Sequence, residues 1–508
     1  MAIHFGGADL NIASGIREFA AAQPNSIAII DGDRRLTFNA LYERACRLSS
    51  GLLAAGLHPG DPIAVLLGNR MEYLEIAAGC AMAGLPTVPL NPRQVAAEIT
   101  YVLEHSGAKA LIVDEILTSN LPTDLPALVL TIEGSSAGPE YENFLHKSRA
   151  VDPEINVKES DPFCIAYTSG TTGKPKGVLI SHRSRTLTFF ATALDWGLGP
   201  GKTSIAVAPM YHGAGFAFGY APVFTGGTTV MQRKFDPDET LQMVQDHKIE
   251  SMFLVPTHAQ MMRALGDQAI TSRDLSTLKT LYFNAAALPV ALKKWVLELF
   301  PQSGVHELYG STEASIVTNL RPKDALRKAG SVGHPWFMTQ VRVVDDAGNP
   351  VAVGEPGELF SRSPYLMNGY LNDPDATAAC TTPDGFLTCG DIVTVDEEGF
   401  ISIVDRKKDL IITGGSNVYP REIEEVLATH ESVAECAVIG LPDETWGERV
   451  VAVLVLRPGK SLDQNAIESF VRGKVAGYKV PKETHVISAL PRNAAGKIVK
   501  REIKDLLP

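Results

Sequence analysis

The sequence predicts an α/β protein with a large N-terminal domain and a small α+β C-terminal domain. Short apolar strands alternate with helical patterns over the first 150 residues, which is typical of parallel sheets covered by helices on both faces. From about residue 333 short strands follow one another with turn residues between them, which favours an antiparallel β subdomain. The last hundred residues have their own helices and strands behind a charged stretch. The 508 residues give room for these parts.

The N-terminal elements are predicted from hydrophobic periodicity. Residues 35–38, 62–67 and 109–113 are expected to be strands, because each is a short apolar or β-branched run. Residues 39–55 carry apolar side chains at helical spacing, and residues 71–83 are also expected to be helical. The alternation continues through the middle of the chain, with no internal repeat.

The predicted β subdomain consists of four short strands at residues 340–344, 357–361, 392–395 and 400–404. Turn-forming runs such as DDAGNP, at residues 345–350, separate them. The charged residues 405–409 are then predicted to form a short polar linker. Beyond them, the pattern predicts helices at 420–428 and 465–475 and strands at 433–439 and 449–456.

Composition excludes several classes of protein. Forty-six Lys and Arg stand against 58 Asp and Glu, a net charge of −12 without a basic tail, which argues against general nucleic-acid binding. Six cysteines without a CxxC pair argue against a disulfide scaffold or a zinc ribbon. The first residues lack a signal-peptide pattern, and the most apolar run, residues 76–90, is too short to span a bilayer. We therefore expect a cytoplasmic enzyme with no integral membrane segment.

The strongest local motif is YTSGTTGKPKG at residues 167–177, directly after an apolar strand. Its glycines, hydroxyls and two lysines form a loop whose backbone N–H groups and side chains can surround an anion. The spacing differs from that of a Walker A loop. A mobile surface turn is the alternative, but this density of donors favours phosphate binding.

Five motifs in order resemble those of the acyl-adenylate-forming superfamily, which includes acyl-CoA synthetases, peptide-synthetase adenylation domains and firefly-type luciferases. The phosphate loop is the first of them. The others are YGSTE at 309–313, TCGD at 388–391, DRKKD with the following ITGGSNVYPREIE, and PRNAAGK at 491–497. TCGD has Cys389 where the family motif is TGD. The resemblance implies that residues 1–404 form an adenylation domain, 405–409 a hinge pivoting at Lys408, and 410–508 a mobile lid domain.

The resemblance also implies ATP and Mg²⁺ chemistry at named residues. Thr168 and Glu313 would hold Mg²⁺ on the phosphates, and Lys497 would bridge the substrate carboxylate and the α-phosphate. Asp391 would accept the ribose hydroxyls with support from Arg406. The residues implied in ATP binding are Thr168, Ser169, Gly170, Thr171, Thr172, Gly173, Lys174, Ala285, Ala286, Glu307, Tyr309, Gly310, Thr312, Asp391, Arg406 and Lys497. The implied catalytic residues are Lys497, Thr168, Glu313 and His212. The segment NAAALP, residues 284–289, resembles the family's adenine-side segment, from which Asn284 and Ala287 depart.

The acid pocket is expected to be lined mostly by apolar groups, and His212 is expected to act as a wall or gate because an ionised acid needs no general base. The expected lining is Phe189 or Phe190, His212, Phe216, Phe283, Asn284, Ser311 and Ile316. It holds no arginine to pair a second carboxylate, which favours a fatty or aryl monocarboxylate.

Free CoA is the expected acyl acceptor. The segments LPDETWGE and YKVPK resemble those of acyl-CoA ligases, and an aromatic ring with lysines suits the CoA nucleotide. The residues implied are Gly414, Gly415, Trp446, Tyr478, Lys479 and Lys482. The main interpretation is an ATP-dependent acid:CoA ligase. An enzyme that loads a separate carrier protein, a catalytically silent nucleotide-binding regulator and a homodimer are left open.

Overall fold

The computed structural model describes residues 9–168, 174–413, 416–443, 445–462, 464–472, 474–492 and 498–507. By compactness the chain divides into one unit of Met1–Gln340 with Ser361–Leu387 and a second of Val341–Phe360 with Thr388–Pro508. The second unit thus takes in most of the predicted β subdomain. The domain boundary at residue 404 and the hinge at 405–409 stay predictions.

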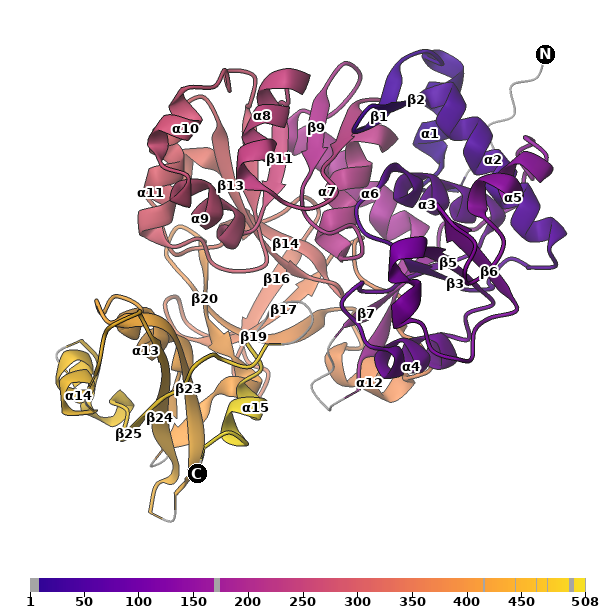
Figure 1. The fold of residues 1–508 in the computed structure, drawn as a ribbon. Helices are drawn as coiled ribbons and strands as arrows, with labels where there is room; N and C mark the ends of the chain where they lie inside the picture. Colours follow the sequence, from indigo (N-terminus) through magenta and orange to yellow (C-terminus); the bar gives the residue numbers. More distant parts are fainter. Residues whose placement is uncertain are drawn as a thin grey trace. The chain divides into compact units, whose positions relative to one another are not determined.

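The first unit contains a nine-stranded sheet in the order β15-β14-β13-β12-β11-β9-β10-β1-β2 (Figure 1). Its central strands are parallel, whereas β2, β14 and β15 are antiparallel. The strands are β1 (Ile27–Asp31), β2 (Arg34–Thr37), β9 (Thr203–Ala206), β10 (Thr228–Met231), β11 (Ser251–Leu254), β12 (Thr280–Phe283), β13 (Gly304–Ser311), β14 (Ser315–Leu320) and β15 (His334–Pro335).

A seven-stranded sheet, in the order β18-β8-β7-β4-β3-β5-β6, belongs to the same unit. The strands from β7 to β6 are parallel to one another. Strand β8 is antiparallel to β7, and β18 is antiparallel to β8. The strands are β3 (Ile63–Leu66), β4 (Thr87–Pro89), β5 (Ala110–Asp114), β6 (Leu128–Ile132), β7 (Pro162–Thr168), β8 (Lys176–Ser181) and β18 (Gly369–Tyr370).

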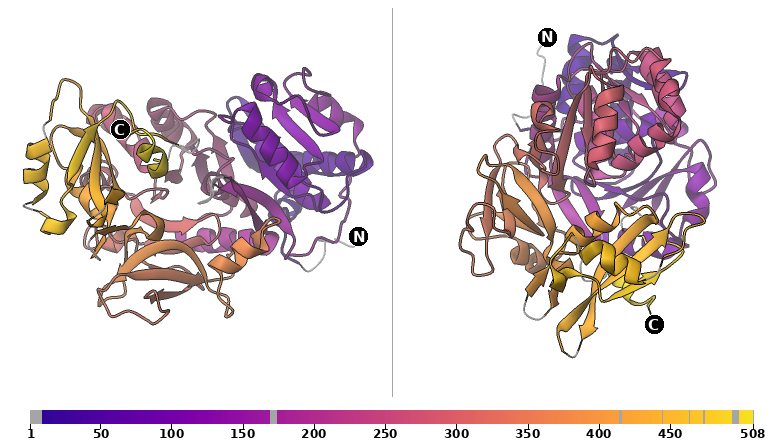
Figure 2. Two further views of the ribbon diagram at one scale, coloured as in Figure 1. Left: turned by 90° about the horizontal axis from the view of Figure 1, so that it is seen from below. Right: turned by 90° about the vertical axis from the view of Figure 1, so that its left-hand side faces the viewer.

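Helices cover both faces of these sheets, as Figures 1 and 2 show. One face of the nine-stranded sheet packs on α8, α9 and α11, and the other on α6 and α7. The helices are α1 (Ser14–Ala22), α2 (Phe38–Ala54), α3 (Met71–Ala83), α4 (Ala96–Ser106), α5 (Tyr141–Lys147), α6 (His182–Trp196), α7 (Gly213–Phe224), α8 (Pro237–His247), α9 (Pro256–Ala264), α10 (Asp267–Thr271), α11 (Val290–Leu299) and α12 (Pro374–Cys380).

The second unit holds the antiparallel strands predicted from residue 340 onward and the C-terminal elements. Its sheets run β16-β17-β19-β20 and β22-β21-β24-β23, with β25 beside β24. The strands are β16 (Gln340–Val344), β17 (Gly357–Arg362), β19 (Leu387–Val395), β20 (Ile401–Arg406), β21 (Ile411–Thr413), β22 (Ser416–Val418), β23 (Val433–Asp443), β24 (Gly447–Leu456) and β25 (Glu483–Val486). The helices are α13 (Pro420–Leu427), α14 (Gln464–Arg472) and α15 (Lys500–Lys504).

The predicted α/β class is confirmed, and several elements fall where periodicity placed them. Helix α3 spans Met71–Ala83, as predicted, and all of its residues are buried. Helix α2 begins after Thr37, whose hydroxyl accepts a hydrogen bond from Ala40 N. Strand β20 runs beyond the predicted residue 404 because Arg406 pairs with Asp391 of β19. Residues 405 and 406 therefore form the end of strand β20.

In the described part of the chain, no helix combines the length and the apolar character needed to cross a membrane.

Candidate active site

The phosphate loop is flanked by the antiparallel strands β7 and β8, which pair Thr168 with Lys176. The Lys174 ammonium lies 5.5 Å from the centre of the Tyr101 ring. The Tyr167 hydroxyl is 2.7 Å from His105 Nδ1, so the first residue of the motif is fixed to α4. The loop residues Ser169, Gly170, Thr171, Thr172 and Gly173 lie outside the described residues.

Glu313 lies in the turn between β13 and β14 and reaches the same region. Its carboxylate accepts a hydrogen bond of 3.1 Å from the Tyr370 hydroxyl, and its carbonyl accepts one of 2.8 Å from Met367 N. The Lys176 ammonium is 4.9 Å from the Tyr370 ring centre. Tyr370 belongs to β18, which pairs with β8. The fold therefore brings Glu313 to the flank of the phosphate loop.

The donor set fits a magnesium ion that is held mainly by phosphates. Mg²⁺ takes oxygen ligands and commonly binds through one or two carboxylates together with substrate phosphates. Thr168 and Glu313 would supply a hydroxyl and one carboxylate of this kind. Among the described residues, no group of three or more His, Cys, Asp or Glu side chains could hold a metal without the nucleotide.

The YGSTE motif forms a tight hairpin at the end of β13. A Cβ on Gly310 would lie 1.8 Å from the Ser315 carbonyl oxygen, so only glycine fits. Ser311 Oγ accepts a 2.9 Å hydrogen bond from Ala314 N, and this bond fixes the turn that carries Thr312 and Glu313. Tyr309 pairs with Thr318 of β14.

The adenine-side segment begins at the end of the neighbouring strand, β12. Asn284 Oδ1 accepts a 2.6 Å hydrogen bond from Ala285 N, and Ala285 has a φ of 74°, a left-handed conformation that is uncommon outside glycine. Ala285 and Ala286 therefore leave β12 in a sharp turn. Strands β12 and β13 are parallel, so this segment and YGSTE share one sheet edge.

Glu307 has a protein partner in this structure. Its carboxylate forms an ion pair with Lys293 of α11, a lysine that is completely buried. Burial raises the pKa of the Glu307 carboxyl. Lys293 was not predicted from the sequence, because it belongs to no motif and lies among the apolar residues of its helix.

The residues predicted to line the acid pocket fall into separate groups. Ile316 belongs to a cluster of aromatic side chains, whereas Phe283 lies in the core on the opposite face of the sheet. Phe216 stacks on Phe163 at 5.7 Å. The cluster around Ile316, hereafter the aromatic cluster, includes Trp196, Phe218, Phe253, Tyr282, Trp336 and Tyr365. None of these six aromatic residues was predicted, because they come from two helices, two strands and two loops that lie far apart in the sequence.

His212 and the two candidate phenylalanines of α6 differ in exposure. His212 is partly buried at the start of α7, 4.5 Å from the Tyr211 ring, centre to centre. Phe189 is fully buried, whereas Phe190 is 53% exposed. Phe189 packs on Phe216, at 6.5 Å between ring centres.

In the second unit, the structure brings Asp391 and Arg406 together. They pair across β19 and β20, and Arg406 Nε lies 3.0 Å from Asp391 Oδ1. Asp391 is buried at 4% exposure, and Gly390 before it has a φ of 74°. The two residues predicted to serve the ribose thus form one ion pair.

The charged stretch after β20 makes specific contacts. Asp405 is buried and accepts hydrogen bonds from its neighbour's backbone, Arg406 N, and from Arg421 N; its burial raises its pKa. The Lys407 ammonium lies 2.9 Å from Glu358 and 3.0 Å from Asp346. A helical turn, Lys407–Asp409, follows.

The residues predicted to bind CoA include two exposed aromatic rings. Trp446 is 57% exposed at the turn between β23 and β24, and Tyr478 is 48% exposed. The Lys479 ammonium already contacts both carboxylate oxygens of Glu422, at 2.7 and 2.9 Å. Lys482 donates its backbone N–H to the Val450 carbonyl. The predicted residues Gly414, Gly415 and Lys497 lie outside the described residues, as does the Lys408 side chain.

Comparison with known proteins agrees with this assembly of motifs. Sequence models of the AMP-binding enzyme family and of its C-terminal domain match residues 16–371 and 422–497. A feruloyl-CoA synthase of Amycolatopsis sp is 36% identical over 493 residues, 96% of each chain. A 2-succinylbenzoate–CoA ligase of Geobacillus kaustophilus is 36% identical over 501 residues, 97% of each chain.

Solved structures show the same fold. The o-succinylbenzoate CoA synthetase of Bacillus subtilis, in complex with its acyl-adenylate intermediate, superposes with a TM-score of 0.86. It is 29% identical, and the match covers 97% of this chain and 98% of that one. The same synthetase has been solved with ATP and a magnesium ion, with a TM-score of 0.85. The chain therefore belongs to the AMP-binding enzyme family, in its acyl-CoA synthetase branch.

Proposed function

We propose that the protein is an ATP-dependent acid:CoA ligase acting on a carboxylic acid with an apolar body, either fatty or aryl. The acid is first converted to acyl-AMP and pyrophosphate, and the acyl group then passes to CoA. The observation that carries the proposal is the grouping of Thr168, Lys176 and Glu313 at the flank of the phosphate loop. This grouping provides a hydroxyl, a cation and a carboxylate where a triphosphate and its metal would bind.

In the first half-reaction, a carboxylate oxygen attacks the α-phosphorus of ATP, and the bond to the bridging oxygen of pyrophosphate breaks. Two anions must approach each other, so positioned cations account for much of the rate. Lys497 would bridge the carboxylate and the α-phosphate. Thr168 and Glu313 would hold Mg²⁺, which neutralises charge on the phosphate oxygens. Asp391 would bind the ribose hydroxyls, with Arg406 holding its carboxylate in place.

In the second half-reaction, the CoA sulfur bonds to the acyl carbon and AMP leaves. Trp446 and Tyr478 present exposed rings, which suit stacking on the CoA adenine. Lys479 and Lys482 would place positive charge near its phosphate, and Lys479 is held by Glu422 in this structure. Gly414 and Gly415 would line the pantetheine path.

An apolar body is favoured because the side chains expected to line the acid pocket are mostly apolar, and one of them, Ile316, packs in the aromatic cluster. Placing a second, unpaired carboxylate among them would carry a large desolvation penalty, on the order of several kcal/mol. The expected result in an acid panel is therefore faster turnover of aliphatic or aryl monocarboxylates than of malonate or succinate. A dicarboxylate as the best acid would contradict this assignment.

The test is a panel of carboxylic acids supplied with ATP, Mg²⁺ and CoA, in which AMP, pyrophosphate and acyl-CoA are measured separately. Formation of all three products supports the proposal. If acyl-AMP reacts only with the phosphopantetheine of a carrier protein, the acceptor is that carrier protein and not CoA. ATP binding without any AMP formation would indicate a silent regulator.

Replacing Lys497 by alanine should abolish most acyl-AMP formation while sparing the reaction of supplied acyl-AMP with CoA. Only the first step brings two anions together, and loss of one oriented charge typically lowers a rate by about 10²–10³-fold. The matched control is Lys504→Ala, which removes an exposed lysine of α15 and should leave both steps unchanged. Equal losses in the two half-reactions would remove Lys497 from this role.

A further inference from the structure

The turn between β3 and α3 places a buried asparagine between the two sheets of the first unit. Asn69 is 6% exposed. Its Nδ2 lies 3.4 Å from the Ala206 carbonyl oxygen, 3.0 Å from that of Ala208 and 3.1 Å from that of Gln232. Its Oδ1 accepts a 2.8 Å hydrogen bond from Met210 N. Both ends of the side-chain amide are thus engaged.

These contacts join the carboxyl ends of strands in different sheets. Asn69 follows β3 of the seven-stranded sheet, whereas Ala206 ends β9 and Gln232 follows β10 of the nine-stranded sheet. In α/β proteins, ligands bind beyond the carboxyl ends of parallel strands. The Asn69 side chain therefore links the two sheets by hydrogen bonds at the edge where ligands are expected to bind.

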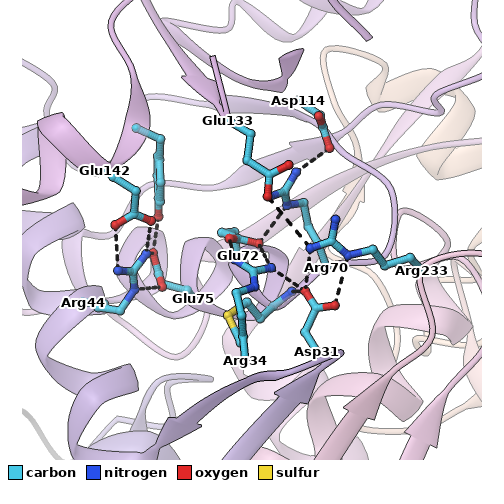
Figure 3. A network of polar contacts seen from close by, with 12 residues as sticks. Asp31, Arg34, Arg44, Arg70, Glu72, Glu75, Asp114, Glu133, Glu142 and Arg233 are labelled. Carbon is cyan, nitrogen blue, oxygen red and sulfur yellow. Dashed lines mark hydrogen bonds and ion pairs between the residues drawn. The ribbon is translucent and has the colours of Figure 1, made fainter. Parts of the chain in front are cut away.

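The backbone beside Asn69 is held by a network of charges around the buried Arg70 (Figure 3). Arg70 lies 2.5 Å from Asp114, at the end of β5, and 2.8 Å from both Glu72 and Glu133. The N–H of Met71 donates to Asp31 at the end of β1. Because Arg70 and Glu72 are buried, this network fixes the turn that presents Asn69.

The loop held by Asn69 leads directly into α7. His212 N donates to the Pro209 carbonyl, and Phe216 N donates to the His212 carbonyl. A Cβ on Gly215 would lie 2.0 Å from Pro209 O, so the loop backbone lies directly against the helix. A displacement of residues 207–212 would therefore displace His212 and the first turn of α7.

We propose that Asn69 is a positioning residue for the acid pocket: its amide fixes loop 207–212, and through it His212 and α7, against the carboxyl edge of both sheets. The kinetic part of this inference rests on the proposed function, because it takes His212 and α7 to line the acid pocket. The structural part, that Asn69 fixes the loop, does not depend on the reaction.

The test compares Asn69→Asp with Ser251→Ala. Aspartate keeps the size of the side chain and the acceptor for Met210 N but has no N–H to donate to the three carbonyls. Ser251 is also buried, and its hydroxyl bonds Ser204 Oγ between β11 and β9 of the nine-stranded sheet, outside residues 207–212. Ser251→Ala therefore controls for the loss of a buried hydrogen bond as such.

Two measurements are made on both variants. Amide hydrogen exchange of peptides covering 207–212 should be about tenfold faster in Asn69→Asp, because the loop loses about one net hydrogen bond. Exchange in residues 251–254 should be unchanged. Steady-state kinetics should show KM for the acid raised about tenfold or more, with KM for ATP within about twofold. Ser251→Ala should change neither the loop's exchange nor either KM.

The outcomes separate the inference from the proposed function. If no acid is activated by the wild-type protein, the proposed function fails, and hydrogen exchange alone decides on Asn69. Unchanged exchange at 207–212, or equal rises of KM for acid and ATP, would overturn the inference. Should Asn69→Asp fail to fold, Asn69→Ser is measured in its place. Failure of both, with Ser251→Ala folded, would make Asn69 a general structural residue and overturn its assignment to the loop.

Discussion

Among single residues, the two carboxylates predicted to bind the metal and the ribose, Glu313 and Asp391, each have a hydrogen-bond partner in the structure. Glu313 is bonded to Tyr370, and Asp391 to Arg406. Both carboxylates are thus oriented by a neighbour rather than free to rotate. A positioned carboxylate loses less entropy on binding its ligand, which favours defined roles for both residues.

Substitution of Glu313 by glutamine should raise the Mg²⁺ concentration that gives half-maximal adenylation, by about tenfold. An amide oxygen is a weaker ligand than a carboxylate for this hard cation. The measurement is acyl-AMP formation over a Mg²⁺ titration. Glu298→Gln changes an exposed carboxylate of α11 and should leave the titration where it was. An unaltered titration for Glu313→Gln would exclude Glu313 as a metal ligand.

Arg185 is a buried residue that the proposed reaction does not use. It is 7% exposed, its Nε has no hydrogen-bond partner within the described residues, and its guanidinium carbon lies 5.8 Å from the Phe163 ring centre. Burial lowers the pKa of Arg185 to about 10. The charged form is therefore less stable in the folded protein than in water.

Replacing Arg185 with methionine should accordingly stabilise the protein. Methionine fills a similar volume without a charge, and the expected gain in the free energy of unfolding is roughly 1–3 kcal/mol. Denaturant unfolding measures it. Arg183→Met, on the same helix, removes an exposed arginine paired with Glu159 and should change stability by less than about 1 kcal/mol. A loss of stability in Arg185→Met would show that Arg185 has a stabilising partner.

Among the elements, the connection between β20 and β21 contains the predicted hinge of the C-terminal region. The Lys407–Asp409 turn joins these strands. Lys497 would act in adenylation and the Gly414–Gly415 turn in thiolation. If these segments lie on different faces of the same domain, that domain must rotate, and a hinge needs free backbone torsions at a few residues.

Lys408→Pro should therefore slow one half-reaction far more than the other, with thiolation the expected loss. Proline fixes φ near −65° and restricts the preceding residue. Pre-steady-state acyl-AMP formation and CoA consumption with supplied acyl-AMP are measured separately. Lys408→Ala keeps the torsions free and should have a much smaller effect. Similar slowing of both steps, or of neither, would place the pivot elsewhere.

At the scale of the whole molecule, the buried charges around Arg70 link strands of both sheets (Figure 3). Hydrogen bonds from Arg70 and Arg34 outweigh desolvation and lower the pKa of Glu72 to about 2. The pKa of an unfolded glutamate is near 4.3. Because the folded pKa is the lower one, the stabilisation is present above about pH 4.3 and is lost as the pH falls toward 2.

Glu72→Gln should remove this pH dependence together with the stabilisation. The shift corresponds to roughly 3 kcal/mol of unfolding free energy near neutral pH. Urea unfolding at pH 7, 5 and 3.5 should show the difference between wild type and variant shrinking as the pH falls. A constant difference across that range would mean that Glu72 contributes through packing rather than charge.

The fold class, the order of the motifs and the positions of many elements follow from the amino-acid sequence. Helix α3 was predictable because most residues from Met71 to Ala83 are apolar, and the phosphate loop because its glycines, hydroxyls and lysines are contiguous. Such features depend on local periodicity and on residues adjacent in the chain, so a single sequence displays them.

Which distant residues come into contact is visible only in the folded protein. Phe283 and Tyr282 are neighbours in β12, yet they face opposite sides of the sheet, so the first lies in the core and the second in the aromatic cluster. Asn69 has no motif, and its partners stand 137 to 163 residues away in the chain. Contacts of this kind depend on how parallel strands are ordered across two sheets, and hydrophobic periodicity along the chain does not encode that order.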